Sequence, residues 1–479
     1  MLFNSYIFVL CFLPVSVAGY FCLNRLKKYR LAECFLLGMS LWFYGYFNIC
    51  YLPIMLISIL GNWAFSCLIA KTGKEKIKKL LLFLAVAINI GSIFYFKYYD
   101  FFIDNINRLF KTNFNLLNLV LPLGISFFTF QQISFQIDHY RENVKYDFLQ
   151  YALFVSFFPQ LVAGPIVTHD EIIPQFADRN RRIIFLDNIG KGIISFTFGL
   201  SKKVLIADAI GNVANCGFSN IAGLDTTNAV LVMLAYTFQI YFDFSGYSDM
   251  AVGIGYMFNI ELPSNFDSPY KSCSINEFWK KWHMTLTRFL RNYIYIPLGG
   301  NRKGRLRVYA NIFIVYLFSG LWHGANWTFI LWGGVHGLAC ILDRLFGSWL
   351  ENVHPALKWM ATFTFINIAW VYFRADSIAS ANGLLYNLIH IQTGPVLPEI
   401  TSALDLPELM WMNQIGMSSV TKCMLIYLVL FCMILGAKNT RERVEKFHYS
   451  MRSGILTGCL LVWNILSFSG VSTFLYFNF

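Results

Sequence analysis

The chain has 479 residues, of which 57% are hydrophobic and only 13% are charged, about half the charged fraction of an ordinary soluble domain. Apolar runs of about 18 to 20 residues, long enough to cross a bilayer, recur from end to end and exclude a soluble globular protein. The net charge is +12, but Lys and Arg cluster in short loops between apolar runs, and nucleic-acid-binding motifs are absent. The charge therefore indicates cytoplasmic loops and not a nucleic-acid partner.

The N-terminal part predicts four transmembrane helices joined by short polar loops. Basic residues cluster at positions 25–30 and 71–79, so we expect both loops to be cytoplasmic and the N-terminus to lie on the opposite face. Residues 100–115 would then lie outside. The predicted spans are Tyr6 to Leu23, Leu31 to Phe47, Tyr51 to Ala70 and Leu80 to Tyr99.

The middle of the chain is less regular. A fifth span is predicted from Leu116 to Ile137, ending in a polar set that includes His139 and Arg141. The next apolar run, Tyr151 to Ile166, is short and contains prolines, so it is a kinked span or a re-entrant segment. Two further spans are predicted at Ile189 to Ile210 and Ala229 to Phe244.

A basic tract extends from Ser245 to Arg307, with apolar residues between its charges at helical spacing. This pattern favours helices lying in the cytoplasmic interface, where membrane lipids are their partners; an ordinary basic loop is the alternative. The apolar members are Phe278, Trp279, Trp282, Leu286, Phe289 and Leu290.

The C-terminal part begins with an apolar stretch, about Val308 to Ile341, that carries Gly, His and Asn in its middle. A long polar loop is expected from Gln392 to Gly416. The chain thus predicts an all-α, polytopic bundle of roughly eleven spans, with one or two re-entrant pieces, in a single domain over residues 1–479. The last spans are predicted at Leu357 to Phe373, Met424 to Ala437 and Ile455 to Phe468.

Three histidines flanked by aromatic residues, His283, His323 and His336, are the candidates for chemistry. A histidine at bilayer depth is costly unless it has a function or faces a protein interior. A neutral imidazole is a natural general base near pH 7 and could deprotonate a hydroxyl for acyl transfer. The motifs GxSxG, HExxH, the Walker loop and GxGxxG are absent, so no metal or tightly bound cofactor is predicted.

Asp243 is the candidate carboxylate, at the end of the span that precedes the basic tract. A carboxylate at a membrane edge can pair with Arg or orient a histidine. It can equally cap the next helix. The sequence leaves these roles open.

Seven further segments form one recognisable set of motifs: Pro122–Phe127, Phe158–Pro165, Tyr241–Gly253, Asn265–Phe266, Phe278–Arg302, Gly320–Gly337 and Trp370–Arg374. Together they resemble the membrane-bound O-acyltransferases, in particular the bacterial branch with alginate and peptidoglycan O-acetyltransferases and the teichoic-acid D-alanyl transferase. The resemblance covers most of the chain and implies a helical bundle around a central passage.

The resemblance implies that His323 is the catalytic histidine and His283 the second signature histidine, in Trp282-His283-Met284-Thr285-Leu286-Thr287. It implies a cytoplasmic acyl donor, with acetyl-CoA expected, and transfer of the acyl group for O-acetylation of an exported polysaccharide or peptidoglycan. It also implies a multi-pass protein of the bacterial inner membrane with a periplasmic partner of the SGNH type. Substrate contacts are expected from Trp282, Lys281, Arg288, Arg291, Trp322, Asn326, Asp243 and His336.

Other functions remain possible at this point. D-alanyl or other acyl transfer to teichoic-acid-type polymers is one. A proton-coupled transporter, with His323 and Asp243 as a proton relay, is another, although paired halves with matching broken spans are absent. A structural subunit of an export complex is the third. Substitution of both His283 and His323 would separate it from the enzymes.

Overall fold

Helices form the regular structure throughout the computed structural model, which describes residues 1–142, 144–406, 412, 414–447, 450–468 and 473–475. No strand occurs in these ranges, so the all-α prediction is confirmed. The chain divides into two compact units. Of the described residues, unit 1 contains those within 1–197, 247–264 and 468–475, and unit 2 contains those within 198–246 and 265–467. The single domain over residues 1–479 stays a prediction.

Unit 1 begins with the helices that the first four predicted spans anticipated. They are confirmed, with bounds shifted by a few residues and a π-helical start at Phe8–Phe12. The fourth helix continues past the predicted end at Tyr99, through a π-helical segment, into α5. These helices are α1 (Leu13–Arg25), α2 (Tyr29–Phe47), α3 (Tyr51–Lys71), α4 (Glu75–Ile93) and α5 (Tyr99–Phe110).

The predicted start of the fifth span at Leu116 is wrong, because α6 (Ile125–Glu142) begins only after Gly124. Gly124 has a φ of +72°, which favours glycine. Upstream, the Asp100 carboxylate accepts the backbone N–H groups of Leu117 and Asn118 at 2.7 and 2.9 Å. The carboxylate thus binds this segment to α5 in a non-helical conformation.

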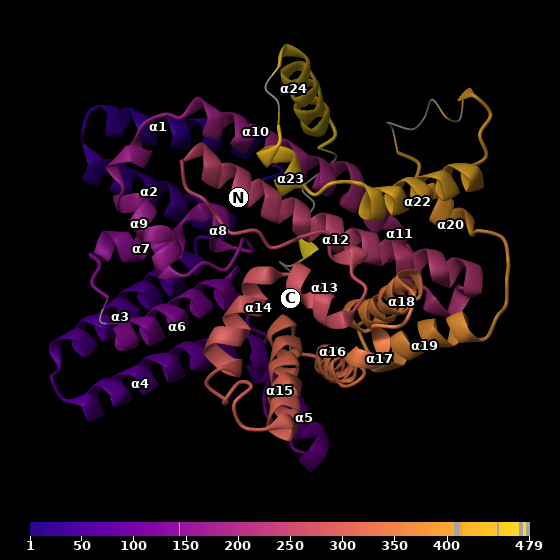
Figure 1. Cartoon of the computed structure of the whole chain (residues 1–479), viewed down its shortest axis with the longest axis horizontal. Coiled ribbons are helices and arrows are strands. Elements are labelled where there is room, and N and C mark those ends of the chain that lie inside the picture. The colour runs from indigo at the N-terminus through magenta and orange to yellow at the C-terminus, as the bar shows by residue number, and fades with distance from the viewer. Residues whose placement is uncertain (143, 407–411, 413, 448–449, 469–472, 476–479) are drawn as a thin grey trace. The chain divides into compact units, whose positions relative to one another are not determined.

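Helices α3, α4 and α6 pack side by side (Figure 1), and hydrogen bonds between buried amides join them. Asn89 Nδ2 donates to Asn62 Oδ1 at 2.7 Å, and Gln136 Nε2 donates to the Asn62 carbonyl oxygen at 2.6 Å. Interhelical amide hydrogen bonds of this kind stabilise helix pairs in apolar surroundings. They explain why α6 is buried although it carries three glutamines.

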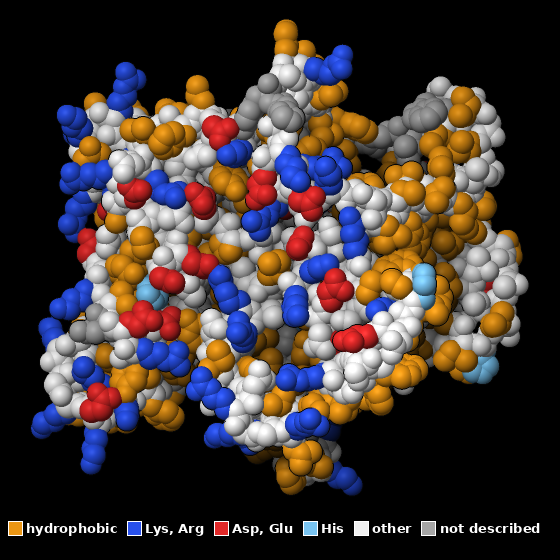
Figure 2. Space-filling view, in the orientation of Figure 1, with side chains coloured by type: hydrophobic (Ala, Val, Ile, Leu, Met, Phe, Trp, Pro, Cys, Tyr) orange, Lys and Arg blue, Asp and Glu red, His pale blue; other side chains and the backbone are white. Residues whose placement is uncertain are grey.

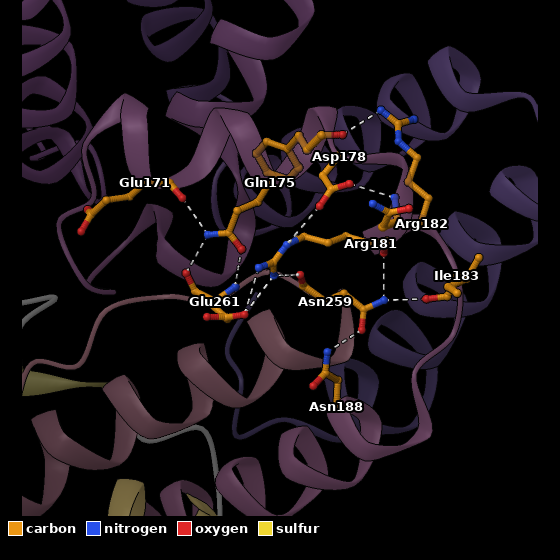
Figure 3. A network of polar contacts seen from close by, with 11 residues as sticks. Glu171, Gln175, Asp178, Arg181, Arg182, Ile183, Asn188, Asn259 and Glu261 are labelled. Carbon is orange, nitrogen blue, oxygen red and sulfur yellow. Dashed lines mark hydrogen bonds and ion pairs between the residues drawn. The ribbon is translucent and has the colours of Figure 1, made fainter.

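The predicted break in the run from Tyr151 to Ile166 is confirmed, because the chain forms two helices there, α7 (Phe148–Ser156) and α8 (Phe158–Leu161). Whether the run is a kinked span or a re-entrant segment stays a prediction. The chain then passes through α9 (His169–Ala177) and a basic turn before α10 (Leu186–Ser201). Arg181 of this turn bonds to Glu261 at 3.1 Å and to the carbonyl oxygen of Asn259 at 2.9 Å (Figure 3). Asn259 Nδ2 donates back to the carbonyl oxygens of Arg181 and Ile183. Part of the basic loop therefore has a structural role, because its hydrogen bonds hold it to other residues of unit 1.

The predicted end of a span at Phe244 is also wrong, because α12 (Thr226–Met257) continues past it. Ser245, Gly246 and Ser248 interrupt the apolar run in the sequence, but all three are small and buried. A Cβ on Gly246 would lie 2.7 Å from the carbonyl oxygen of Gly199, so glycine permits close helix packing there. Preceding α12 are a π-helix at Lys202–Ala207 and α11 (Asp208–Ser219).

The basic tract forms short helices of unit 2, α13 (Ile275–Lys281) and α14 (Met284–Leu290). Figure 2 shows basic side chains gathered over this pair, whereas apolar side chains cover α22 (Ser419–Gly436). All six apolar residues named for the tract are buried. The predicted helices are thus confirmed, with their apolar face packed inside the protein; their place at a membrane surface stays a prediction.

The three last predicted spans are helical, and the stretch from Val308 to Ile341 forms two helices. The helices at Ile378–Ile389 and Pro398–Ser402 were not predicted, and the second lies within the expected loop from Gln392 to Gly416. Part of the predicted loop from Gln392 to Gly416 lies outside the described residues. Five helices in the described ranges are long and apolar enough to cross a membrane: Phe8–Arg25, Tyr51–Lys71, Glu75–Phe110, Thr226–Met257 and Ser419–Gly436. The count of eleven spans stays a prediction. The remaining helices are α15 (Arg305–His323), α16 (Trp327–Leu345), α17 (Gly347–Leu350), α18 (Pro355–Arg374), α19 (Ile378–Ile389), α20 (Pro398–Ser402), α23 (Thr440–Glu445) and α24 (Met451–Leu466).

Candidate active site

Helices α15 and α16 lie side by side as a tight hairpin (Figure 1). His323 is the last residue of α15, where the turn to α16 begins. A Cβ on Gly320 would lie 2.2 Å from the carbonyl oxygen of Phe329, and one on Gly333 would lie 2.3 Å from that of Tyr316. The two backbones are therefore in contact, which only glycine permits. His323 ends α15 one turn beyond this contact.

His323 is enclosed by aromatic rings and is 3% exposed. Its ring centroid lies 4.8 Å from Trp322, 5.3 Å from Trp332 and 5.0 Å from Phe373, all in edge-to-face arrangements. Such packing fixes the orientation of the imidazole. A base held rigidly in a layer that excludes water suits proton transfer at one defined position.

His283 lies in the turn between α13 and α14, with a φ of +45°. An isolated bridge between Phe266 and Trp282 holds this turn. Asn265 Oδ1 contacts the Nδ1 of His283 at 3.3 Å and accepts the Thr285 hydroxyl at 2.7 Å. The left-handed conformation is uncommon for residues other than glycine, although histidine adopts it more readily than most, and the hydrogen bonds of Asn265 hold it here.

Trp322 joins the two predicted catalytic histidines. Its ring lies 5.9 Å from His283 and 4.8 Å from His323. Residues far apart in sequence thus meet in one buried aromatic layer of unit 2. The structure thus brings together the two predicted catalytic histidines and Trp322, a predicted substrate contact.

Complete burial lowers the pKa of His283 to about 3, because the charged imidazolium loses its hydration. The folded chain therefore keeps this ring neutral, whereas the unfolded chain protonates it below the ordinary value of 6.5. The stabilisation of the folded state that results from this difference is fully present above about pH 6.5, and it is lost as the pH falls towards the pKa of the folded state.

We therefore expect the wild-type protein to lose about 2 kcal/mol more unfolding free energy between pH 7.5 and pH 5 than the His283→Gln variant. Chemical unfolding in detergent at several pH values measures this difference. Parallel pH profiles for the two proteins would contradict a neutral, buried His283.

His336 lies on α16 and is fully buried. Trp279 Nε1 donates a hydrogen bond to its Nδ1 at 3.2 Å. Because Nδ1 accepts, the ring is neutral and carries its proton on Nε2. Its ring contacts Trp332 at 4.7 Å, and Trp332 also contacts His323. Trp332 thus connects the third predicted histidine to His323. The sequence prediction did not include Trp332, although its position four residues before His336 places both residues on the same face of a helix.

The remaining predicted substrate residues differ in their surroundings. Trp282 is buried against the rings of Phe266 and Trp370, each at 5.0 Å. Lys281 is paired with Glu277 at 2.7 Å. Arg288 is half-buried on α14 and Arg291 is exposed. Their contacts with substrate stay predictions.

Asn326 caps α16, because its Oδ1 accepts the backbone N–H of Thr328 at 3.1 Å. Its Nδ2 donates to the carbonyl oxygen of Asp376 at 3.0 Å. These bonds fix the turn that follows His323. A substrate contact of Asn326 stays a prediction.

Asp243 lies within α12, so the alternative in which it caps the next helix is wrong. It forms an ion pair with Lys203 at 2.6 Å, and both side chains are 2% exposed. Lys203 also contacts Asp208 at 2.8 Å. The predicted Arg partner is thus a lysine, which the sequence showed only as a charge inside an apolar run.

A model of the MBOAT, membrane-bound O-acyltransferase family matches residues 138–381, a range that contains His283, His323 and His336. The chain is 40% identical to the peptidoglycan O-acetyltransferase of Helicobacter pylori, over 100% of this chain and 98% of that protein.

Two other relatives are informative. The chain is 38% identical to the probable alginate O-acetylase AlgI of Pseudomonas aeruginosa, over 80% of this chain and 73% of the relative. It is 27% identical to the teichoic acid D-alanyltransferase of Bacillus subtilis, over 53% of this chain and 69% of that protein. The match along the whole length of a relative and the matched family range together show that the chain belongs to the membrane-bound O-acyltransferase family.

Proposed function

We propose that this acyltransferase moves an acetyl group from cytoplasmic acetyl-CoA across the bacterial inner membrane, for O-acetylation of peptidoglycan or an exported polysaccharide. The observation that carries the proposal is His323, a buried imidazole oriented by three aromatic rings at the turn of a tight helical hairpin. The full-length relative is named for peptidoglycan and the AlgI relatives for alginate, which supports a polysaccharide acceptor.

In the proposed reaction, His323 acts as the general base. It takes the proton from the acceptor hydroxyl, whose oxygen attacks the thioester carbonyl carbon of the donor. The tetrahedral intermediate collapses, the carbon–sulfur bond breaks, and the thiolate leaves with the proton from His323. The aromatic layer excludes water, which protects the thioester from hydrolysis.

The donor would meet the basic surface of α13 and α14. Arg291 is exposed and Arg288 half-exposed, so both can attract the phosphates of acetyl-CoA. Lys281 is already paired with Glu277 and would contribute less. On the far side, a periplasmic SGNH-type partner would receive the acetyl group and complete its transfer.

We expect deletion of the gene to remove base-labile acetate from isolated peptidoglycan or exported polysaccharide, and complementation to restore it. Released acetate and released D-alanine, measured together, identify the acyl group. Loss of D-alanine esters with unchanged acetate would replace this proposal by the alternative of D-alanyl transfer. Unchanged amounts of both would contradict acyl transfer to the envelope.

A further inference from the structure

One face of α16 carries three buried polar groups, each one turn from the next. They are the Thr328 hydroxyl, the Trp332 Nε1–H and the His336 Nε2. The three residues are at most 1% exposed, and none of these atoms has a hydrogen-bond partner among the residues that the structure describes. Buried polar groups are nearly always paired, so three such groups on one face indicate a ligand.

Two of the three groups can only donate. An indole Nε1–H has no lone pair to offer, and the Nε2 of His336 carries the ring proton because Trp279 donates to Nδ1 at 3.2 Å. Two donors one helical turn apart fit an oxygen atom with two lone pairs. A carbonyl oxygen that gains negative charge is the ligand that such a pair stabilises most.

The donor pair lies beside the candidate base. The Trp332 ring stands perpendicular to the His323 ring, at 89° and 5.3 Å between centroids, and it contacts the His336 ring at 4.7 Å. Trp332 thus links the donor pair to the imidazole that would take the proton. The Thr328 hydroxyl precedes Trp332 by one turn on the same face.

We propose that the Trp332 Nε1–H and the His336 Nε2–H form the oxyanion hole for the acyl carbonyl of a thioester donor, an assignment that rests on the proposed function. When the hydroxyl oxygen bonds to the carbonyl carbon, the π electrons move to the carbonyl oxygen and the two N–H groups stabilise its charge. Collapse re-forms the carbonyl as the carbon–sulfur bond breaks. Trp279 is a positioning residue, because it fixes the tautomer of His336.

The test compares kcat and KM for acetyl-CoA in purified variants. Trp332→Phe keeps most of the ring and removes the N–H, so we expect kcat to fall about 100- to 1,000-fold with little change in KM. The kcat of His336→Leu should fall by a similar factor. The kcat of His336→Gln should fall less, because glutamine retains an N–H donor. The matched control is Trp370→Phe, because the Trp370 N–H already donates to Tyr270 at 3.2 Å and its ring stacks on Trp332.

Thermal unfolding midpoints establish that each variant is folded; if Trp332→Phe does not fold, the comparison of His336→Leu with His336→Gln decides. A folded Trp332→Phe with wild-type kcat, an equal loss in Trp370→Phe, or equal losses in the two His336 variants would overturn the oxyanion hole. The His323→Ala variant separates the two proposals. If it is inactive while Trp332→Phe is fully active, only the oxyanion hole fails; if it transfers acetyl at the wild-type rate, the proposed base fails.

Discussion

We expect the His323→Ala substitution to lower the rate of acetyl transfer about 100- to 10,000-fold, which is the range that a positioned general base contributes. The imidazole lies among three aromatic rings at 4.8 to 5.3 Å, so water cannot easily replace it as a base. The measurement is the O-acetyl content of the cell envelope in a deletion strain that expresses the variant, normalised to the protein level in the membrane.

The matched control for this experiment is His390→Ala. His390 also belongs to unit 2, but its side chain is exposed and contacts Tyr386 of its own helical turn, while its backbone carbonyl oxygen accepts the Thr226 hydroxyl, a contact that alanine keeps. It should keep wild-type acetylation. Normal acetylation by the His323→Ala protein at a normal level would contradict the catalytic role of His323.

Replacement of Lys203 by methionine is expected to destabilise the protein by about 3 to 5 kcal/mol, because it leaves the buried Asp243 carboxylate without this cation. Asp243→Asn should cost less, since Lys203 keeps its contact with Asp208 at 2.8 Å. The double variant Lys203→Met/Asp243→Leu should regain most of the stability, because both charges are then absent. Chemical unfolding in detergent measures the three values.

The neighbouring lysine provides the control for this series. Lys202 is partly exposed and its ammonium lies 6.0 Å from the ring of Tyr241, so Lys202→Met should cost no more than about 1 kcal/mol. If Lys203→Met were as stable as the wild type but inactive, the pair would belong to the reaction. Asp243 would then regain the substrate role that the sequence allowed.

The helices could be predicted from the sequence wherever one continuous apolar run corresponds to one helix. The helices within the first four predicted spans are of this kind. The errors arose where contacts with residues distant in the sequence determine the local conformation. The segment before α6 reads as apolar but is held in a non-helical conformation by Asp100. The C-terminal part of α12 reads as polar, yet its small residues pack against another helix at Gly246.

The site shows the same division. The aromatic flanks of His283 and His323 marked them in sequence, and the structure joins them through Trp322. The partner of Asp243 could not be predicted, because Lys203 comes from a distant segment. Trp332 could not be predicted for another reason. Tryptophan is common in this chain, and Trp332 differs from a packing residue by its buried N–H, which has no acceptor among the described residues.

The most direct test of the account is transfer by the purified protein in liposomes, supplied with acetyl-CoA labelled in the acetyl group and with an acceptor. We predict that the wild type releases one CoA thiol for each acetyl ester formed, and that folded His323→Ala protein releases none above background. Equal ester formation by both proteins would contradict His323 as the base. Movement of a solute by folded wild-type protein without any consumption of acetyl-CoA would contradict acyl transfer itself.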